Sequence, residues 1–199
     1  KYLRAVVIGM VISDATIYTN GFYSGIKFEQ STMQYFFVHH LFYLFKDYTF
    51  ASDISVRFNS KDKKTIKSFY FKTFTHPTFS ELYNIFYING KKVLSIDLLN
   101  LVDEVALAYW IMGDGSFNKK DNILVLHTQG FDKENNELIS KFFNKKFGLN
   151  TYLTRAKSNN GQTWYYLVNI PHRDKEFIIN KIAPHILEEF KYKVNYKTF

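Results

Sequence analysis

The stretch Leu107-Ala-Tyr-Trp-Ile-Met-Gly-Asp114-Gly115 is apolar over most of its length and ends in an aspartate and a glycine. The stretch Val7-Ile-Gly-Met-Val-Ile-Ser-Asp14-Ala15 has the same design, with its acid 100 positions earlier in the chain. Apolar runs of this length, bounded by polar residues, indicate buried segments, and we interpret both as helices. We therefore expect two buried helices that carry Asp14 and Asp114 at equivalent ends.

The same series of elements is expected after each acid. Each series contains a hairpin, an amphipathic helix, a second pair of strands and a last helix. In the first half these are residues 16–29, 32–45, 53–59 with 67–75, and 79–86. In the second half they are residues 116–128, 132–147, 150–157 with 163–170, and 173–182. Turn residues support the hairpins at Asn20-Gly21, at Lys119-Lys120-Asp121-Asn122 and at Asn159-Asn160-Gly161.

This repetition predicts an α+β fold of two pseudo-symmetric αββαββα halves. Each half is expected to contain a curved antiparallel sheet, and the halves are expected to pack through the two apolar helices. The polar stretch Asn89-Gly90-Lys91-Lys92 reads as the linker. We place the halves at residues 1–94 and 95–199.

Composition favours a nucleic-acid partner. The 199 residues carry a formal charge of +8 although only 22% of them are charged, and 46% are apolar, which is ample for a core. No run of 18 apolar residues is present, so no membrane association is expected. The absence of cysteine excludes disulfides, cysteine-based zinc sites and thiol chemistry.

The residue usage also bears on the source of the gene. The 21 Phe and 15 Tyr accompany many Asn, Lys and Ile, whose codons are rich in A and T. An organelle genome gives this bias, and so does an AT-rich nuclear or bacterial genome. The sequence begins at Lys1, and no targeting segment is recognised in it.

Both apolar motifs, together with Leu126-His-Thr-Gln-Gly-Phe131, resemble the LAGLIDADG homing endonucleases. The resemblance covers essentially the whole chain and is closest to the single-chain, two-motif proteins encoded in introns of mitochondria and plastids. The second motif is the closer match. In the first, Ala15 stands where the family usually has glycine, a residue that we expect because a left-handed conformation often follows a helix. Ile12 and Met112 stand where the family name implies an acid.

The resemblance implies a monomeric, magnesium-dependent endonuclease that makes a double-strand break with 3′ overhangs at a long, asymmetric DNA target. Mn²⁺ or Ca²⁺ can substitute in binding, and the expected location is the mitochondrion, with the plastid as the alternative. Two carboxylates at the negative ends of neighbouring helices would repel each other, and a divalent cation relieves this repulsion. The expected catalytic residues are Asp14, Asp114, Lys92, Lys193, Gln30 and Gln129. The expected metal ligands are Asp14, Asp114 and the backbone carbonyls of Ala15 and Gly113.

DNA contacts are expected from the four pairs of strands, in which polar and apolar residues alternate. The candidates are basic or aromatic, and they are Lys27, Arg57, Lys67, Tyr70, Lys72, Lys119, Arg155 and Lys157. Because the halves differ at these positions, the target is expected to be asymmetric.

Three other functions stay open at this point. The first is an intron maturase that binds RNA, and the second is a catalytically inactive DNA-binding relative. The third is an unrelated basic α+β binding module. No HExxH, GxSxG, Walker or GxGxxG motif supports other chemistry.

Overall fold

The structure, a computed structural model, describes residues 1–158 and 161–194. It divides into two compact units, unit 1 (Lys1–Val93) and unit 2 (Leu94–Phe199). The boundary falls one residue before the one drawn from the sequence. Both units are mixed α/β structures with antiparallel sheets, as the repeat predicts.

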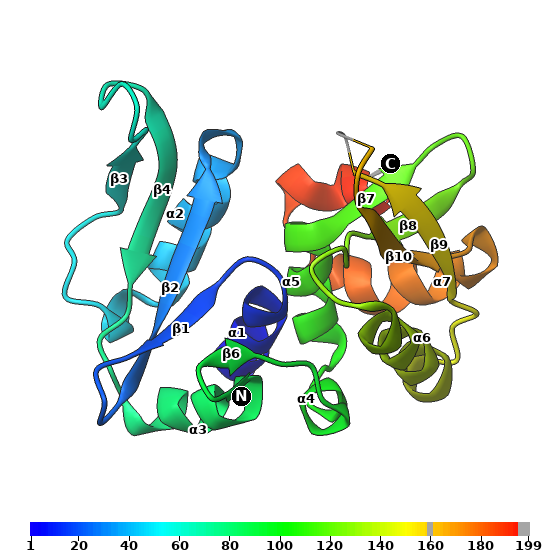
Figure 1. The fold of residues 1–199 in the computed structure, drawn as a ribbon, viewed down its shortest axis with the longest axis horizontal. Coiled ribbons are helices and arrows are strands. Elements are labelled where there is room, and N and C mark those ends of the chain that lie inside the picture. The colour runs from blue at the N-terminus through cyan, green and yellow to red at the C-terminus, as the bar shows by residue number, and fades with distance from the viewer. Residues whose placement is uncertain (159–160, 195–199) are drawn as a thin grey trace. The chain divides into compact units, whose positions relative to one another are not determined.

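Unit 1 begins with the first motif helix, α1 (Tyr2–Ile12), which is followed by the hairpin of β1 (Thr16–Thr19) and β2 (Ser24–Ser31) (Figure 1). Next come α2 (Tyr35–Leu44), the strands β3 (Ser55–Phe58) and β4 (Ile66–Lys72), and α3 (Pro77–Phe86). Short 3₁₀ turns, Thr32–Gln34 and Lys46–Tyr48, flank α2. The sheet is antiparallel with the strand order β1-β2-β4-β3.

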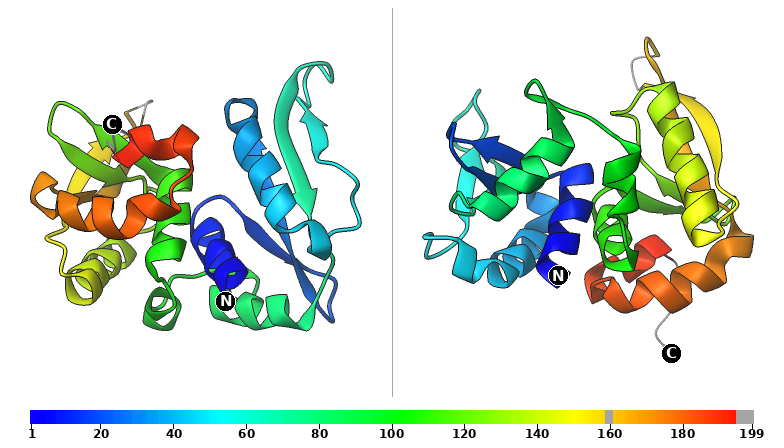
Figure 2. Two further views of the ribbon diagram at one scale, coloured as in Figure 1. Left: turned by 180° about the vertical axis from the view of Figure 1, so that it is seen from behind. Right: turned by 90° about the horizontal axis from the view of Figure 1, so that it is seen from below.

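The core of unit 1 is aromatic. Helix α2 covers one face of the sheet, as the left view of Figure 2 shows. Phe28 of β2 stacks on Phe71 of β4 with 5.0 Å between ring centroids, and Phe42 of α2 meets Phe71 edge-on at 5.4 Å. Because one face is covered, the polar side chains that alternate with these residues lie on the opposite face.

Unit 2 repeats this order. A short helix, α4 (Ile96–Asn100), precedes the second motif helix, α5 (Glu104–Asp114). After it come β7 (Gly115–Asn118), β8 (Ile123–Leu126), α6 (Lys133–Phe147), β9 (Tyr152–Lys157) and β10 (Trp164–Ile170). The strand order is β7-β8-β10-β9, again antiparallel. Asp132 caps α6 by accepting the Asn135 N–H at 2.8 Å, and Gly148 ends it with a φ of 65°.

Three features differ from the expected elements. Residues 173–182 do not form one helix but a 3₁₀ turn (His172–Asp174), a single turn α7 (Lys175–Phe177) and a π-helical turn (Ile178–Ile182). Two 3₁₀ segments, Ala183–His185 and Glu188–Val194, follow. Pro184 has no N–H, so a regular helix cannot continue through this residue. Helix α4 was not predicted, and α1 ends before Asp14, whereas α5 includes Asp114.

The expected linker is a structured hairpin. Strand β5 (Tyr87–Ile88) pairs with β6 (Lys91–Lys92), and the turn residues Asn89 and Gly90 both have positive φ, 50° and 73°. Two consecutive positive φ values are typical of a tight hairpin turn with Asn-Gly. The hairpin therefore fixes the position of Lys92. The turn residues Asn159 and Asn160 lie outside the described residues.

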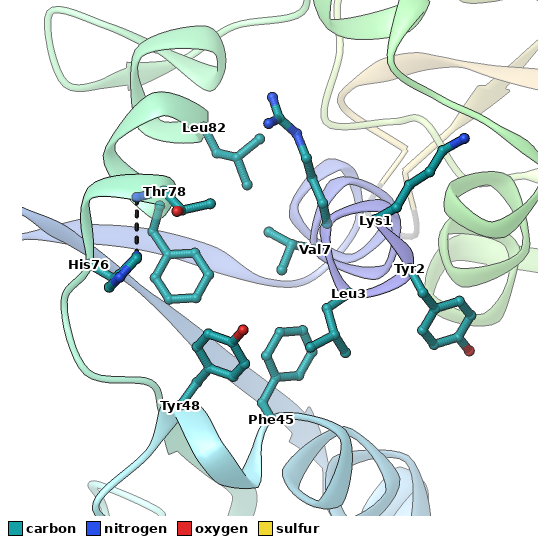
Figure 3. Close-up of a pocket in the computed structure, with 11 residues that line it drawn as sticks. Lys1, Tyr2, Leu3, Val7, Phe45, Tyr48, His76, Thr78 and Leu82 are labelled. Atoms are coloured by element: carbon teal, nitrogen blue, oxygen red, sulfur yellow. Dashed lines mark hydrogen bonds between the residues drawn. The ribbon is translucent and has the colours of Figure 1, made fainter.

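A hollow of about 310 Å³ lies in unit 1 between α1, the end of α2 and the start of α3 (Figure 3). Its wall is mostly apolar or aromatic, as at Val7, Phe45 and Leu82. His76 caps α3, because its Nδ1 accepts the Thr78 N–H at 3.3 Å. Among the described residues, no helix has the length and apolar character that a membrane span requires.

Candidate active site

The first candidate acid, Asp14, lies in an exposed turn just beyond α1. Where the helix ends, the Ser13 hydroxyl donates to the carbonyls of Gly9 at 3.1 Å and Met10 at 3.2 Å. The Ala15 N–H also donates to the Met10 carbonyl, at 2.7 Å. This wide turn leaves room for the Cβ of Ala15, which is buried.

Gln30 of β2 holds the carboxylate of Asp14. Its Nε2 donates to Asp14 Oδ2 at 3.0 Å. Gln30 is only 7% exposed and lies on the core side of the sheet, because its registered partner on β4 is Phe69. The structure thus brings together two of the residues that the sequence predicts in the active site.

The second acid, Asp114, is half-buried at the last position of α5. Its carbonyl accepts the His127 N–H at 2.9 Å, and the N–H of Gly115 donates to Ile111. Gly115 has a φ of −85°, so the expected left-handed conformation is wrong. Glycine is required here for a different reason, since a Cβ would lie 2.5 Å from the Ile111 carbonyl oxygen.

A lysine ammonium lies on the last carbonyls of each motif helix. Lys92 Nζ donates to the carbonyl of Ile12 at 3.1 Å and reaches that of Ser13 at 3.5 Å. Lys193 Nζ donates to the carbonyls of Met112 at 2.6 Å and Gly113 at 3.1 Å. A cation at a helix C-terminus is favoured by the exposed carbonyls and by the helix dipole.

The two lysines nevertheless differ in burial. Lys92 is exposed on β6, whereas Lys193 is 6% exposed in the last 3₁₀ segment, with its Nζ 5.0 Å from the Phe190 ring centroid. Within each unit, a lysine that lies about 80 residues from the acid in sequence thus reaches the turn that carries it.

Strand register identifies equivalent positions next to the two acids. Thr16 pairs with Lys27, and Gly115 pairs with Leu126. When these pairings are extended beyond the strand ends toward the acids, Glu29 falls opposite Asp14 and His127 falls opposite Asp114. Thr128 is therefore the counterpart of Gln30.

Gln129 does not occupy the position expected for it. It is exposed in the turn after β8, and in the described part of the chain no hydrogen bond involves its side chain. Thr128 is buried, and its hydroxyl donates to Asn136 Oδ1. The structure thus places Gln30 beside its acid, whereas Gln129 lies one position beyond the equivalent residue.

His127, within the motif Leu126-His-Thr-Gln-Gly-Phe131, lies near Asp114, although no role was expected for it. Its Nε2 lies 2.7 Å from the Ser116 hydroxyl, on the polar face of the second sheet. Burial, together with the positive charge of Lys193, lowers the pKa of His127. The neutral imidazole is thereby favoured close to the acid.

The polar face of the first sheet gathers four of the predicted DNA-binding residues. Lys27 pairs with Lys72 across β2 and β4, and Tyr70 pairs with Ser55 of β3, next to Arg57. The Lys72 ammonium lies 5.1 Å from the ring centroid of Tyr18. Lys67 lies apart from this face, at a bulge where β4 has one more residue than β3.

In unit 2 the predicted basic residues lie elsewhere on the sheet. Arg155 and Lys157 share a face with Trp164, whose ring centroid lies 4.3 Å from Arg155 Cζ and 4.9 Å from Lys157 Nζ. Buried Val168 and Leu126 lie on the same face. Arg155, Lys157 and Trp164 therefore lie on the face opposite to that of His127. Lys119 is exposed in the β7–β8 turn. Trp164 was not predicted, although its alternation with Tyr166 on β10 places it beside the cations.

The donors in each unit suit a hard cation. Carboxylate and carbonyl oxygens are preferred by Mg²⁺, which keeps several waters and also takes phosphate oxygens. Across residues 1–158 and 161–194, no group of three or more His, Cys, Asp or Glu side chains is placed to hold a metal. A cation here would therefore need water and phosphate oxygens in addition to carboxylate and backbone carbonyl oxygens.

The repeated helix, acid and four-stranded antiparallel sheet define a two-unit protein of the αββαββα class. Residues 4–177 match the family described as the LAGLIDADG DNA endonuclease family. The chain belongs to this family.

Individual relatives agree with this assignment. The chain is 34% identical over 134 residues to "Probable intron-encoded DNA endonuclease 3" of Mycosarcoma maydis, covering 65% of this chain and 94% of that protein. It is 35% identical over 176 residues to "Probable intron-encoded endonuclease 1" of Wickerhamomyces canadensis, covering 85% and 72%. The solved structure of the homing endonuclease I-WcaI bound to its DNA recognition sequence has a TM-score of 0.81 at 30% identity, covering 99% of this chain and 87% of that one.

The chain is also similar to a protein named as a maturase. The cytochrome b mRNA maturase bI2 of Debaryomyces hansenii is 32% identical over 136 residues. The match covers 68% of this chain and 48% of that protein.

Proposed function

We propose that the chain is a homing endonuclease that makes a double-strand break with 3′ overhangs at a long, asymmetric DNA target. The observation that carries the proposal is the repeated end of the motif helix. In each unit an aspartate, Asp14 or Asp114, follows or ends the helix, and a lysine donates to the carbonyls of the same turn. Family membership and the likeness to a DNA-bound homing endonuclease support the assignment.

Asp14 and Asp114 are the proposed ligands of a divalent cation, Mg²⁺, for which Mn²⁺ or Ca²⁺ can substitute in binding. The carbonyls of Ala15 and Gly113 are proposed as further oxygen ligands. These two residues are not equivalent in the repeat, because the counterpart of Gly113 is Ser13. When bound, the cation supplies an activated water and neutralises charge on the phosphate.

The other side chains act on position and charge. Gln30 fixes the orientation of the Asp14 carboxylate and is placed to hydrogen-bond a water beside it. Gln129 is proposed for the same role in unit 2, where it requires a change in the turn that carries it. Lys92 and Lys193 stabilise the negative charge that develops on the phosphate oxygens during hydrolysis.

DNA binding is assigned to the residues predicted from the strands. The polar face of the first sheet carries Lys27, Arg57, Tyr70 and Lys72. Of the others, Lys67 lies at a bulge, Lys119 lies in a turn, and Arg155 and Lys157 lie on β9. Because the two sheets present different side chains, the two halves of the target differ, and a monomer suffices. The intron-encoded relatives support a mitochondrial location, with the plastid as the alternative.

Plasmid cleavage tests this function. A plasmid that carries the joined exons flanking the reading frame is expected to be linearised with Mg²⁺ and to stay supercoiled in EDTA. Asp14→Asn and Asp114→Asn are each expected to lower the cleavage rate by about 100-fold or more while DNA binding persists. Cleavage by both variants at the wild-type rate would overturn the catalytic assignment.

The second candidate function is an RNA maturase that assists splicing of a group I intron, favoured by the likeness to a cytochrome b mRNA maturase. The distinguishing measurement is splicing of the host intron with and without the protein. Accelerated splicing, without cleavage of the joined exons, would replace the endonuclease with the maturase.

A further inference from the structure

A carboxylate, Glu29, lies among the basic residues of the first sheet. It projects from β2, and its side chain is 25% exposed. Arg57 of β3 donates to it from Nε at 2.6 Å and from Nη2 at 3.3 Å. Ser68 Oγ of β4 donates at 2.5 Å, and Lys27 Nζ donates to the second carboxylate oxygen. Glu29 therefore joins three neighbouring strands.

An aromatic ring completes this arrangement. Tyr70 is the registered partner of Glu29 on β4. The ammonium of Lys27 and the guanidinium carbon of Arg57 each lie 5.3 Å from the Tyr70 ring centroid. Both cations are thus held by a carboxylate and by the face of a ring. We call Lys27, Glu29, Arg57, Ser68 and Tyr70 the Glu29 cluster.

The charge of the Glu29 cluster is unusual for a surface that only holds phosphates. A carboxylate repels the DNA backbone, and here it neutralises one of two cations. Burial raises the pKa of Glu29, but hydrogen bonds from Lys27, Ser68 and Arg57 outweigh it and lower the pKa to about 2. The acid is therefore charged under all conditions in which DNA is bound, and its repulsion must be offset by another gain.

Fixed geometry provides that gain. Phosphate contacts tolerate flexible cations, whereas base edges are distinguished by donors and acceptors held in place. Arg57 donates to Glu29 from Nε and Nη2, and these two bonds fix the plane of its guanidinium group. Nη1 takes no part in this contact. An oriented arginine and an acidic acceptor together discriminate between base pairs better than free cations do.

The described residues of unit 2 do not form such a cluster. His127 occupies the position of Glu29, next to Ser116. The cations Arg155 and Lys157 lie with Trp164 on the other face. Any effect of Glu29 on recognition is therefore confined to one half of the target.

We propose that Glu29 is a positioning residue for base recognition, which orients Arg57 and Lys27 so that unit 1 discriminates between base pairs in its half of the DNA target. This inference rests on the proposed endonuclease function. It assigns Glu29 to specificity rather than to affinity.

The test is a binding selection from a duplex library in which both halves of the joined-exon sequence are randomised, performed with the full chain. Because the chain has no cysteine, Lys63→Cys gives a single attachment point for a DNA-cleaving reagent, which marks the half that lies beside unit 1. Glu29→Gln removes the charge and keeps the size of the side chain. Glu81→Gln is the matched control, since Glu81 on α3 pairs with Arg4 of α1 at 3.6 Å, outside the cluster.

For Glu29→Gln we expect discrimination to fall about 10-fold at one or more base pairs beside unit 1. The other half should keep its profile, and binding to unrelated duplex should rise with a steeper salt dependence. Arg57→Lys, which keeps the charge but loses the planar fork, should weaken discrimination at the same base pairs. Glu81→Gln should match the wild type.

Two outcomes would contradict the role of Glu29 in base recognition without contradicting the proposed endonuclease function. One is a wild-type profile in both folded variants, Glu29→Gln and Arg57→Lys. The other is an equal loss of discrimination in both halves, because that indicates a general change in the protein. A wild-type chain that selects no duplex sequence overturns the proposed function itself, and the inference with it.

Discussion

The side-chain amide of Gln30 donates a hydrogen bond to the carboxylate of Asp14, with 3.0 Å between Nε2 and Oδ2. The amide is buried and the acid is exposed, so β2 presents a fixed donor to a group that solvent and DNA can reach. The contact joins the predicted ligand to the sheet that carries the Glu29 cluster.

Removal of this donor is the first prediction. Gln30→Ala is expected to lower the cleavage rate by about 10- to 100-fold, because residues that orient a metal ligand have effects of this size. Binding to the target should change little. The measurement is single-turnover cleavage of the joined-exon duplex at saturating protein.

Gln129→Ala is the matched variant. Gln129 is exposed in a turn that must change before its amide can act, so we expect a smaller loss of cleavage than for Gln30→Ala, about 10-fold or less. An equal loss in both variants would show that the turn after β8 rearranges on DNA, and that the pairing predicted from the sequence holds in the complex.

The sequence predicts the order of elements because each element depends on a local pattern. Apolar runs mark α1 and α5, turn residues mark the hairpins, and Asp132 with Gly148 marks both ends of α6. These signals are independent of contacts that are distant in sequence. The αββαββα order could therefore be predicted from the chain alone.

The register of strand pairing in the two hairpins that follow the acids could not be predicted from such local patterns. The loops Asn20–Tyr23 and Lys119–Asn122 have four residues each, but the strands between the acid and the loop are one residue longer in unit 1. A position 16 residues after Asp14 therefore corresponds to one 14 residues after Asp114. The sequence count paired Gln30 with Gln129, and the strand pairing gives Thr128 instead.

The candidate active site also depends on contacts between residues that are distant in sequence. The lysines could be placed near the motif helices only by resemblance, because a segment about 80 residues away supplies each of them. The Glu29 cluster was missed, since an acid between basic residues reads as an ordinary solvated charge until the three strands are paired.

Lys193 is the subject of the second prediction. Lys193→Met leaves the carbonyls of Met112 and Gly113 without their donor in a buried setting. We expect the free energy of unfolding to fall by about 1–3 kcal/mol, measured by urea denaturation. Lys92→Met, at an exposed lysine with the same kind of contact, should cost less than about 1 kcal/mol. A smaller loss for Lys193→Met than for Lys92→Met would contradict this account.

The third prediction concerns the residues that follow the two acids. Gly115→Ala would place a Cβ 2.5 Å from the Ile111 carbonyl oxygen, so the end of α5 must shift. We expect a loss of about 1–3 kcal/mol in stability, together with slower cleavage, because Asp114 moves with the helix end. Ala15→Gly should change stability by about 1 kcal/mol or less, since the wider turn already accepts a Cβ. Thermal unfolding of both variants measures the difference, and equal losses would argue against it.

The fourth prediction concerns acid stability and follows from the carboxylate of Glu29. Its pKa of about 2 in the folded protein lies below its ordinary value of 4.5, because donors from Lys27, Ser68 and Arg57 outweigh burial. A lowered folded pKa stabilises the protein above pH 4.5, and this contribution is lost as the pH falls from about 4.5 toward 2. The difference in unfolding free energy between wild type and Glu29→Gln should therefore be constant near pH 7 and shrink below about pH 4.5. Denaturant titrations at a series of pH values measure this difference. A difference that instead grows as the pH falls would mean that Glu29 is not held by these donors in solution.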